Sequence, residues 1–269
     1  MRRAVAATLW LVTLLASTVA IGAGWTTLHV QSRSGFVDLV GTVGDDPDVR
    51  QAAAELAGDA FARRSGLGQP WRDDAERLVT QAIVRLEEAD DWSRAWRQTA
   101  SRTHAGLLLR DPPPVVDADL APLVDLALDE ITADLPIDLP RPATLPVTVS
   151  RDDPAVWVTA VSRSAEVTTV AVGVGLIAAM LAVATARRRA LMVAALGGGL
   201  VASTAVWWVA GRLVAPAVVG RRGDTPQAQR LAEVLADRMV DSFMSLSWPV
   251  AAAGLALAAA GLLTRVVRP

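Results

Sequence analysis

Two aspartates on one predicted strand are the first residues whose spacing could support chemistry. Asp117 and Asp119 are separated by a single alanine. Both side chains would therefore point to one face of an extended strand, where carboxylate oxygens could hold Mg²⁺, Mn²⁺ or Ca²⁺. Two carboxylates are too few to specify a metal. We favour the alternative, in which both aspartates face solvent while Val116 and Ala118 face the core.

A serine and a histidine form the second candidate pair. His104 follows Ser101 by three residues, so on a helix its imidazole could act as a general base toward that hydroxyl. We favour a partly buried structural histidine instead, and we interpret His29 as an interfacial residue. The chain has no Cys and no phosphate-binding glycine loop, nucleophile elbow, zinc-protease signature or EF-hand pattern. We therefore predict no catalytic residue, no cofactor or cofactor-binding residue, and no metal site.

Four uncharged segments are the main feature of the sequence around these candidate residues. The chain has 269 residues, of which 52% are hydrophobic, a high share for a soluble protein. Crossing a bilayer core of about 30 Å takes roughly 20 apolar residues in a helix. We predict four transmembrane helices in the segments that lack any Asp, Glu, Arg or His, namely residues 4–27, 167–186, 190–211 and 242–264.

The first of these segments has an alternative interpretation as a cleaved secretory signal. Residues 1–3 are basic at two positions, and the small residues near positions 18–20 resemble a cleavage site. The apolar run continues to Trp25, which is longer than the usual signal core, so an uncleaved anchor is favoured. Both interpretations export the chain that follows.

The distribution of arginine predicts the orientation of the spans. With the N-terminus inside, residues 1–3, 187–189 and 265–269 are cytoplasmic and contain seven Arg and no acid, whereas the remainder holds nineteen Arg and all 28 acids. Basic residues in short loops favour the cytoplasmic side. We therefore predict a multi-pass plasma-membrane protein with both termini cytoplasmic. The outer helix ends would then carry an interfacial belt of Trp25, Trp207, Trp208 and Trp248.

Residues 28–165 form the long polar stretch and predict an extracytoplasmic α+β domain. Asp46 and Pro47 are typical of a helix start, and Gly66 of its end. A second helix is expected to carry on one face Trp71, Ala75, Leu78, Ala82 and Leu86. A third, capped by Asp91, ends at Asp111 and carries Trp92, Trp96, Thr99, Thr103 and Leu107.

The periodicity then changes to that of a small β element. Alternation around residues 116–120 predicts a strand, Pro122 a helix start, and residues 145–150 a second strand. This order favours a parallel pair with a right-handed crossover. Asp153 and Pro154 are expected to begin a helix that continues unbroken into the second span.

The last region, residues 166–269, is predicted to contain three spans and an external amphipathic helix at 225–241. Thr225 would cap this short helix, which either lies on the outer leaflet or, as we favour, packs against protein. Inside the spans, small residues predict close helix approach; they include Gly173, Gly175, Gly197, Gly198, Gly199, Ala251, Gly254, Ala258 and Gly261.

The order of these features resembles a family. A basic start and anchor precede a Trp- and His-containing segment at residues 92–108, the junction Val-Asp-Ala-Asp-Leu-Ala-Pro-Leu at 116–123, and an Arg-hinged pair of spans. The whole chain is similar to uncharacterised four-span integral membrane proteins of actinobacteria, which have an extracytoplasmic domain after the first span. The resemblance implies a cell-membrane location and contributes no catalytic residue.

These patterns predict a function that does not involve catalysis. We expect a non-enzymatic protein of the cell envelope whose extracytoplasmic domain is an interaction or assembly module, with the lipid bilayer and an envelope or membrane protein as partners. A net charge of −2 gives no reason to expect nucleic acid. Two alternatives stay open: an accessory subunit of a transporter, and an envelope hydrolase or transferase that uses Asp117, Asp119 or His104. Spans without ionisable groups argue against an ion or proton path through this chain alone.

Overall fold

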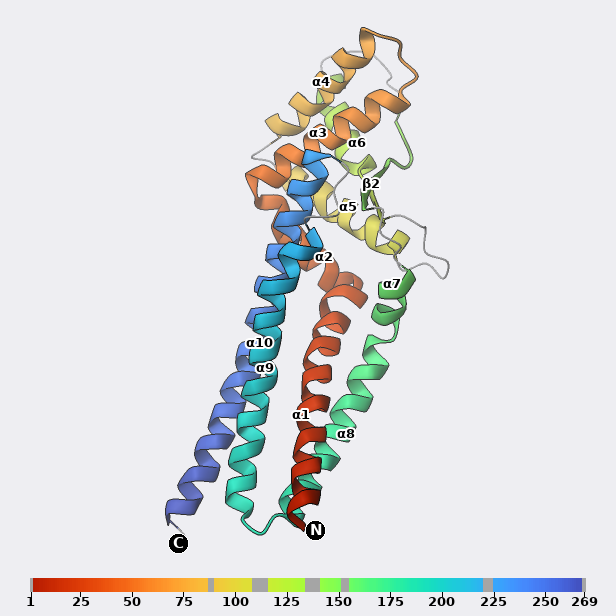
Figure 1. The fold of residues 1–269 in the computed structure, drawn as a ribbon. Coiled ribbons are helices and arrows are strands. Elements are labelled where there is room, and N and C mark those ends of the chain that lie inside the picture. The colour runs from red at the N-terminus through yellow and green to blue at the C-terminus, as the bar shows by residue number, and fades with distance from the viewer. Residues whose placement is uncertain are drawn as a thin grey trace. The chain divides into compact units, whose positions relative to one another are not determined.

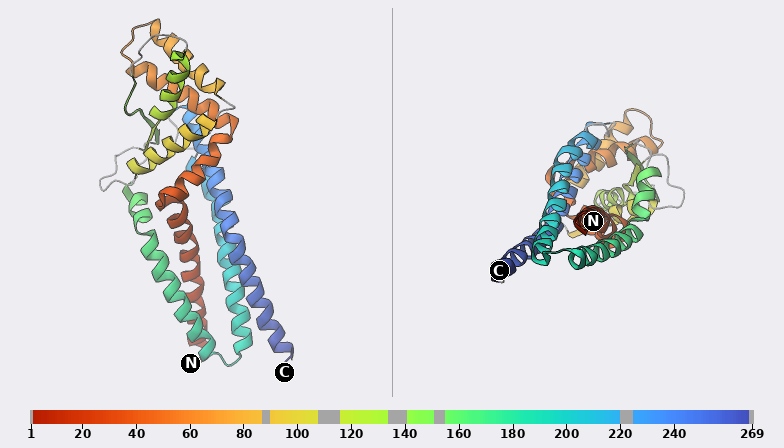
Figure 2. Two further views of the ribbon diagram at one scale, coloured as in Figure 1. Left: turned by 180° about the vertical axis from the view of Figure 1, so that it is seen from behind. Right: turned by 60° about the horizontal axis from the view of Figure 1, so that its bottom comes forward.

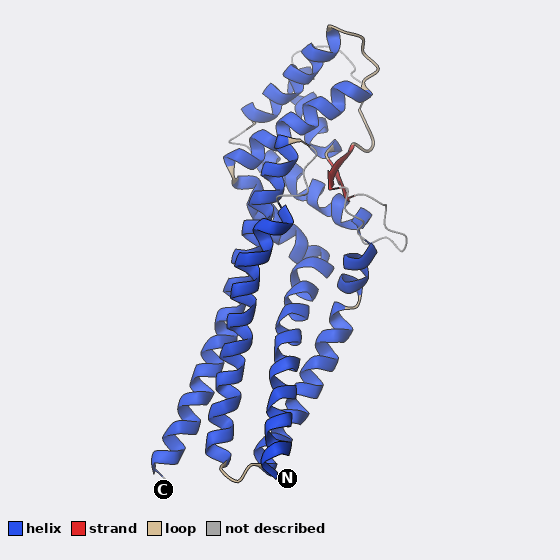
Figure 3. Ribbon diagram, viewed as in Figure 1, coloured by secondary structure: helices blue, strands red, loops and turns tan. Residues whose placement is uncertain are grey.

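The structure is a computed structural model that describes residues 2–86, 90–107, 116–133, 141–150, 155–219 and 225–267 (Figure 1). The described residues are mostly helical, with one pair of short strands among them (Figure 3). The chain divides into two compact units. We call the first the bundle (Met1–Val30, Ala160–Ala215 and Val240–Pro269) and the second the polar domain (Gln31–Thr159 and Pro216–Met239).

Long apolar helices build the bundle. They are α1 (Arg2–Thr26), which a π-helical turn η1 (Thr27–Gln31) extends, α8 (Ser164–Thr185), α9 (Arg189–Val219) and the later part of α10 (Pro226–Val267). These helices lie side by side in Figure 1 and in the left view of Figure 2. By length and composition, four helices of the described chain could cross a membrane, and they coincide with the four predicted segments.

Glycine lets α9 and α10 approach closely. A Cβ added at Gly254 would lie 2.8 Å from the Gly197 carbonyl oxygen, and one at Gly261 would lie 2.5 Å from the Ala190 carbonyl oxygen. Real Cβ atoms do not approach this closely, so only glycine fits at these positions. Close approach through Gly197, Gly254 and Gly261 is therefore confirmed, whereas Gly173 and Gly198 face open space.

Hydrogen bonds between side chains and backbone join α1 to α9. Trp10 Nε1 donates to the Ala195 carbonyl at 2.8 Å, and Trp207 Nε1 donates to the Thr18 carbonyl at 2.7 Å. Between them, Thr18 Oγ1 donates to Ser203 Oγ at 3.1 Å. A polar group in apolar surroundings must find a partner within the protein, and these bonds supply partners across the interface.

Aromatic rings gather at one level of the bundle. Phe243 on α10 lies 5.8 Å from Trp25 and 5.4 Å from Trp207, measured between ring centroids. Trp208 and Trp248 meet edge to face at 5.0 Å. These contacts place the four tryptophans of the predicted belt at the same level of the bundle.

Shorter helices build the polar domain: α2 (Arg33–Gly41), a 3₁₀ turn η2 (Thr42–Asp45), α3 (Pro47–Arg64), α4 (Trp71–Arg85), α5 (Asp90–Leu107), α6 (Ala121–Thr132) and α7 (Ala155–Ser162). Asp46 caps α3 by accepting the Asp48 N–H at 2.9 Å, as its position predicted. Gly66, at φ +71°, follows the end of α3. Alanines along α3 leave room for a core that includes Ile83, Trp92, Leu123, Leu128 and Leu145.

The strands β1 (Val116–Asp119) and β2 (Pro146–Ser150) are confirmed, but they pair antiparallel, so the predicted parallel crossover is wrong. The reason lies where the chain re-enters the sheet. α6 begins directly after β1, and the chain returns to that same end of the strand, where the Leu120 N–H donates to the Leu145 carbonyl at 3.0 Å. From this point β2 can only run back along β1.

Two predicted helix boundaries are also wrong. α7 and α8 are separate helices with Arg163 between them, so no unbroken helix enters the second span. Conversely, α10 is one helix of 42 residues, where the sequence suggested a short helix and a separate span. Its start agrees with the prediction, because Thr225 Oγ1 accepts the Ala228 N–H at 3.1 Å. The predicted helix end at Asp111 and the predicted helix start at Asp153 lie outside the described residues.

The first turns of α10 belong to the polar domain and pack into its core. Ala228 and Leu231 are buried, and Leu231 belongs to the core cluster, with Val234 and Leu235 packed against it. The interpretation that residues 225–241 pack against protein is therefore confirmed for the described side chains.

Candidate functional site

Asp119 is held by main-chain and side-chain donors of the polar domain. Its Oδ1 accepts the Ala121 N–H at 3.1 Å and the Leu145 N–H at 2.8 Å, and its Oδ2 lies 3.5 Å from Arg102 Nη1. The side chain is 17% exposed, so the prediction that it faces solvent is wrong. Asp119 joins the end of β1, the start of α6 and the entry to β2, which is a structural role.

Asp117 makes a simpler contact on the same strand. Its Oδ1 accepts a hydrogen bond from Thr148 Oγ1 on β2 at 2.8 Å, and the residue is half-buried. Cross-strand polar pairs of this kind stabilise a short β ladder. Within the described ranges, no group of three or more His, Cys, Asp or Glu residues is arranged to hold a metal ion.

The Ser101 and His104 side chains are engaged by α2. Ser101 Oγ accepts a hydrogen bond from Arg33 Nε at 2.9 Å. His104 is 7% exposed, and its ring centroid lies 5.1 Å from that of Phe36. A guanidinium donates but cannot accept a proton, so Arg33 does not activate the hydroxyl. These contacts support the interpretation of His104 as a buried structural residue.

Asp125 is a residue that the sequence reasoning missed. It lies on α6, and its Oδ1 is enclosed without a hydrogen-bond partner among the described residues. Burial raises the pKa of this carboxyl above its usual 3.8, and the nearby guanidinium groups of Arg141 and Arg102 act in the opposite direction. The sequence carried no signal for it, because Asp125 lies off the apolar stripe of α6 that holds Leu123, Val124, Ala127 and Leu128.

The outward side of α4 is the second feature that the sequence reasoning missed. We define the α4 surface by the residues that line a shallow depression there: Leu67, Trp71, Asp74, Ala75, Arg77, Leu78 and Gln81. Trp71 is 67% exposed and Leu78 is 55% exposed. The predicted apolar face is therefore only partly buried. α4 packs on the core through Val79, Ala82 and Ile83, whereas Trp71 and Leu78 point outward.

The α4 surface is apolar and carries no net charge. Its depression has a volume of about 520 Å³, and its two charged side chains, Asp74 and Arg77, form an ion pair with each other. An exposed Trp beside two exposed leucines is typical of a protein interaction site, where aromatic side chains supply much of the binding energy. Charge neutrality makes nucleic acid or a charged small molecule a poor fit for this surface.

Comparison of the chain with protein-family models, with curated proteins and with solved structures finds no match.

Proposed function

We propose that the chain is a multi-pass plasma-membrane protein and that its polar domain is a non-enzymatic interaction module of the cell envelope. The outward faces of the bundle support the membrane location. Leu176, Ile177 and Met180 on α8 are 60%, 57% and 64% exposed, and Leu255 and Leu263 on α10 are 58% and 64% exposed. In water so much exposed apolar surface is unfavourable, whereas hydrocarbon accommodates it.

The proposed orientation has both termini in the cytoplasm and the polar domain outside. Its support is the run of arginines at residues 187–189, together with Arg2, Arg3 and Arg265, at the ends of the candidate spans. Positive charge in short loops favours retention on the cytoplasmic side.

The exposed Trp71 is the observation that carries the interaction role. It sits on a helix that Val79 and Ile83 anchor in the core, so its indole is presented from a rigid element. A rigid, neutral, apolar surface fits a protein partner with an apolar contact face. The side chains proposed for an envelope hydrolase or transferase, in contrast, already serve structural contacts: Asp117, Asp119 and His104.

The interaction can be tested by photocrosslinking from the α4 surface in living cells. A photoreactive side chain introduced at Gln81 should yield a discrete protein adduct. The same group at Arg63, an exposed position on α3, is the matched control and should not give that adduct. Mass spectrometry then identifies the captured protein. A permease or an ATPase would support the transport-accessory alternative, and an adduct of twice the chain's mass would show that the partner is a second copy.

A second variant connects the adduct to the proposed contact. The double substitution Trp71→Ala and Leu78→Ala truncates exposed side chains, so the fold should persist while the adduct falls at least tenfold. Arg85→Ala, at an exposed position of α4 outside the depression, should leave the adduct unchanged. An adduct that survives the double substitution, or no adduct at Gln81, would contradict the proposal.

The orientation can be tested with thiol labelling, because the chain has no Cys. Single substitutions Gln69→Cys and Gln229→Cys should react with an impermeant thiol reagent in intact cells. A cysteine appended after Pro269 should react only after the cells are opened. Labelling of the appended cysteine in intact cells would refute cytoplasmic termini.

A further inference from the structure

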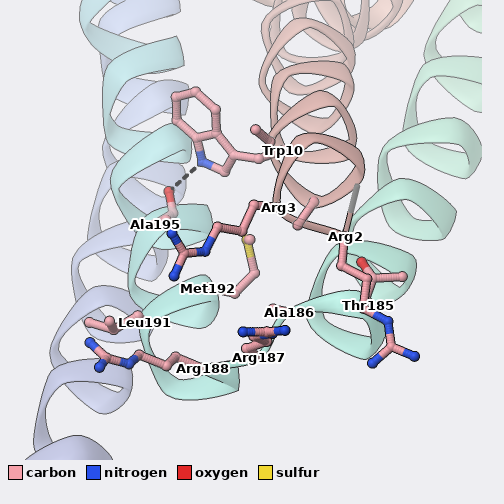
Figure 4. Close-up of a pocket in the computed structure, with 12 residues that line it drawn as sticks. Arg2, Arg3, Trp10, Thr185, Ala186, Arg187, Arg188, Leu191, Met192 and Ala195 are labelled. Carbon is pink, nitrogen blue, oxygen red and sulfur yellow. Dashed lines mark hydrogen bonds between the residues drawn. The ribbon is translucent and has the colours of Figure 1, made fainter.

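A basic pocket lies at one end of the bundle. It has a volume of about 660 Å³, is open on one side, and is lined by the start of α1, the turn between α8 and α9, and the start of α9. Figure 4 shows Arg3 reaching across the pocket toward α9, Arg187 below it in the turn, and Arg2 and Arg188 on opposite sides. All four arginines line the pocket.

The positive charge of this pocket is uncompensated by the bundle. None of the pocket's lining residues is acidic, and no ion pair joins these arginines to another residue in the described part of the chain. The bundle contains only two acids, Glu166 and Asp241. Glu166 lies in the first turn of α8, whose 22 residues place it about 30 Å from the pocket's end of that helix. Four like charges around one pocket therefore create a positive potential that attracts an anion.

The floor of the pocket is apolar. Trp10 is fixed by the hydrogen bond from its Nε1 to the Ala195 carbonyl at 2.8 Å, drawn in Figure 4. Met192 and Leu191 line the same cavity. A separate apolar groove between α8 and α9 includes Met180 and Leu196, with Arg189 also lining it. A ligand with a phosphate group and hydrocarbon chains matches both features, whereas a free phosphate would use only the first.

We propose that this pocket binds the phosphate headgroup of an anionic phospholipid through Arg2, Arg3, Arg187 and Arg188. The inference rests on the proposed membrane location, which puts the pocket where the apolar spans end and lipid headgroups begin. Arginine is suited to this role because its planar guanidinium can donate two parallel hydrogen bonds to phosphate oxygens. Basic pockets between the cytoplasmic ends of spans are suited to anionic headgroups.

The test measures lipid retention and thermal stability of the full-length chain in an uncharged detergent. Three probes are added separately: dioleoylphosphatidylglycerol, dioleoylphosphatidylcholine and inorganic phosphate. We expect phosphatidylglycerol to remain bound in native mass spectrometry and to raise the unfolding temperature, with less effect as salt increases. The other two probes should do neither. Equal effects of the two lipids, or full stabilisation by inorganic phosphate alone, would overturn the proposal.

Variants assign the effect to the pocket. Each arginine near an anionic lipid contributes about fivefold in affinity, so Arg187→Gln with Arg188→Gln should weaken phosphatidylglycerol binding about 30-fold. The control pair Arg163→Gln and Arg212→Gln removes the same charge from outside the pocket and should leave binding unchanged. Arg187→Lys with Arg188→Lys should restore part of the affinity, because charge returns without the paired donors. Equal losses in both Gln pairs would refute a specific site.

The lipid proposal and the membrane proposal fail in different ways. A chain that inserts into vesicles but does not distinguish the two lipids contradicts the pocket assignment alone. A chain that stays dispersed in buffer without detergent contradicts the membrane location itself.

Discussion

Replacement of Asp119 by alanine should destabilise the polar domain far more than the same replacement of Asp117. The Asp119 carboxylate accepts two main-chain N–H groups at 3.1 and 2.8 Å, and its other oxygen lies 3.5 Å from Arg102. A hydrogen bond to a charged group contributes about 1.5–3 kcal/mol, and the partly exposed ion pair adds less than about 1 kcal/mol. Allowing for relaxation and water entry at the site, we expect Asp119→Ala to cost about 2–4 kcal/mol.

A buried reporter thiol can measure this loss in the complete chain. Ala127 is fully buried on α6 and the chain has no native Cys, so Ala127→Cys supplies one protected thiol. When the domain recloses faster than the thiol reacts, the alkylation rate follows the opening equilibrium. A cost of about 2–4 kcal/mol predicts alkylation roughly 30-fold to several hundred-fold faster in Asp119→Ala.

Asp117→Ala in the same reporter background is the matched control. It removes one hydrogen bond, from Thr148, at a half-buried position. With the same allowance for relaxation and water entry we expect a cost of about 1–1.5 kcal/mol and an acceleration of roughly tenfold. Similar rates in the two variants, or a change below about threefold in Asp119→Ala, would refute the structural role assigned to Asp119.

Two further predictions concern the bundle and the buried carboxyl. Gly197→Ala would place a Cβ against the Gly254 carbonyl and the main chain at Ala258, so it should destabilise the detergent-solubilised chain by about 1–3 kcal/mol. Gly198→Ala meets nothing within 4 Å and should be neutral, and equal melting temperatures for the two variants would count against the α9–α10 packing. Burial raises the pKa of Asp125 above 3.8. The contribution of this carboxyl to the folding stability of the domain is therefore fully present below pH 3.8 and is lost as the pH rises through the raised pKa. Asp125→Asn should therefore raise the melting temperature at pH 7 but not at pH 3.5, and a gain of the same size at both values would exclude this cause.

Local patterns in the sequence predicted the main elements. Charge-free segments predicted the four long helices, Asp46 with Pro47 predicted the start of α3, and Thr225 predicted the start of α10. Each of these features depends on neighbouring residues alone. A cap satisfies N–H groups of its own helix, and an apolar run of sufficient length forms a helix because its backbone groups bond to one another.

Tertiary structure decided which of several locally equivalent arrangements forms. Trp71 and Val79 both lie on apolar stripes of α4, and only packing against the rest of the domain buries Val79 and exposes Trp71. The direction of β2 depends on where the chain returns after α6, and the roles of Asp119 and Asp125 depend on groups distant in sequence. The pocket arginines likewise occur in two short segments more than 180 residues apart, which the packing of α1 against α9 brings together. Periodicity gives the faces of an element, but the free energy of burying one face rather than another depends on the whole fold.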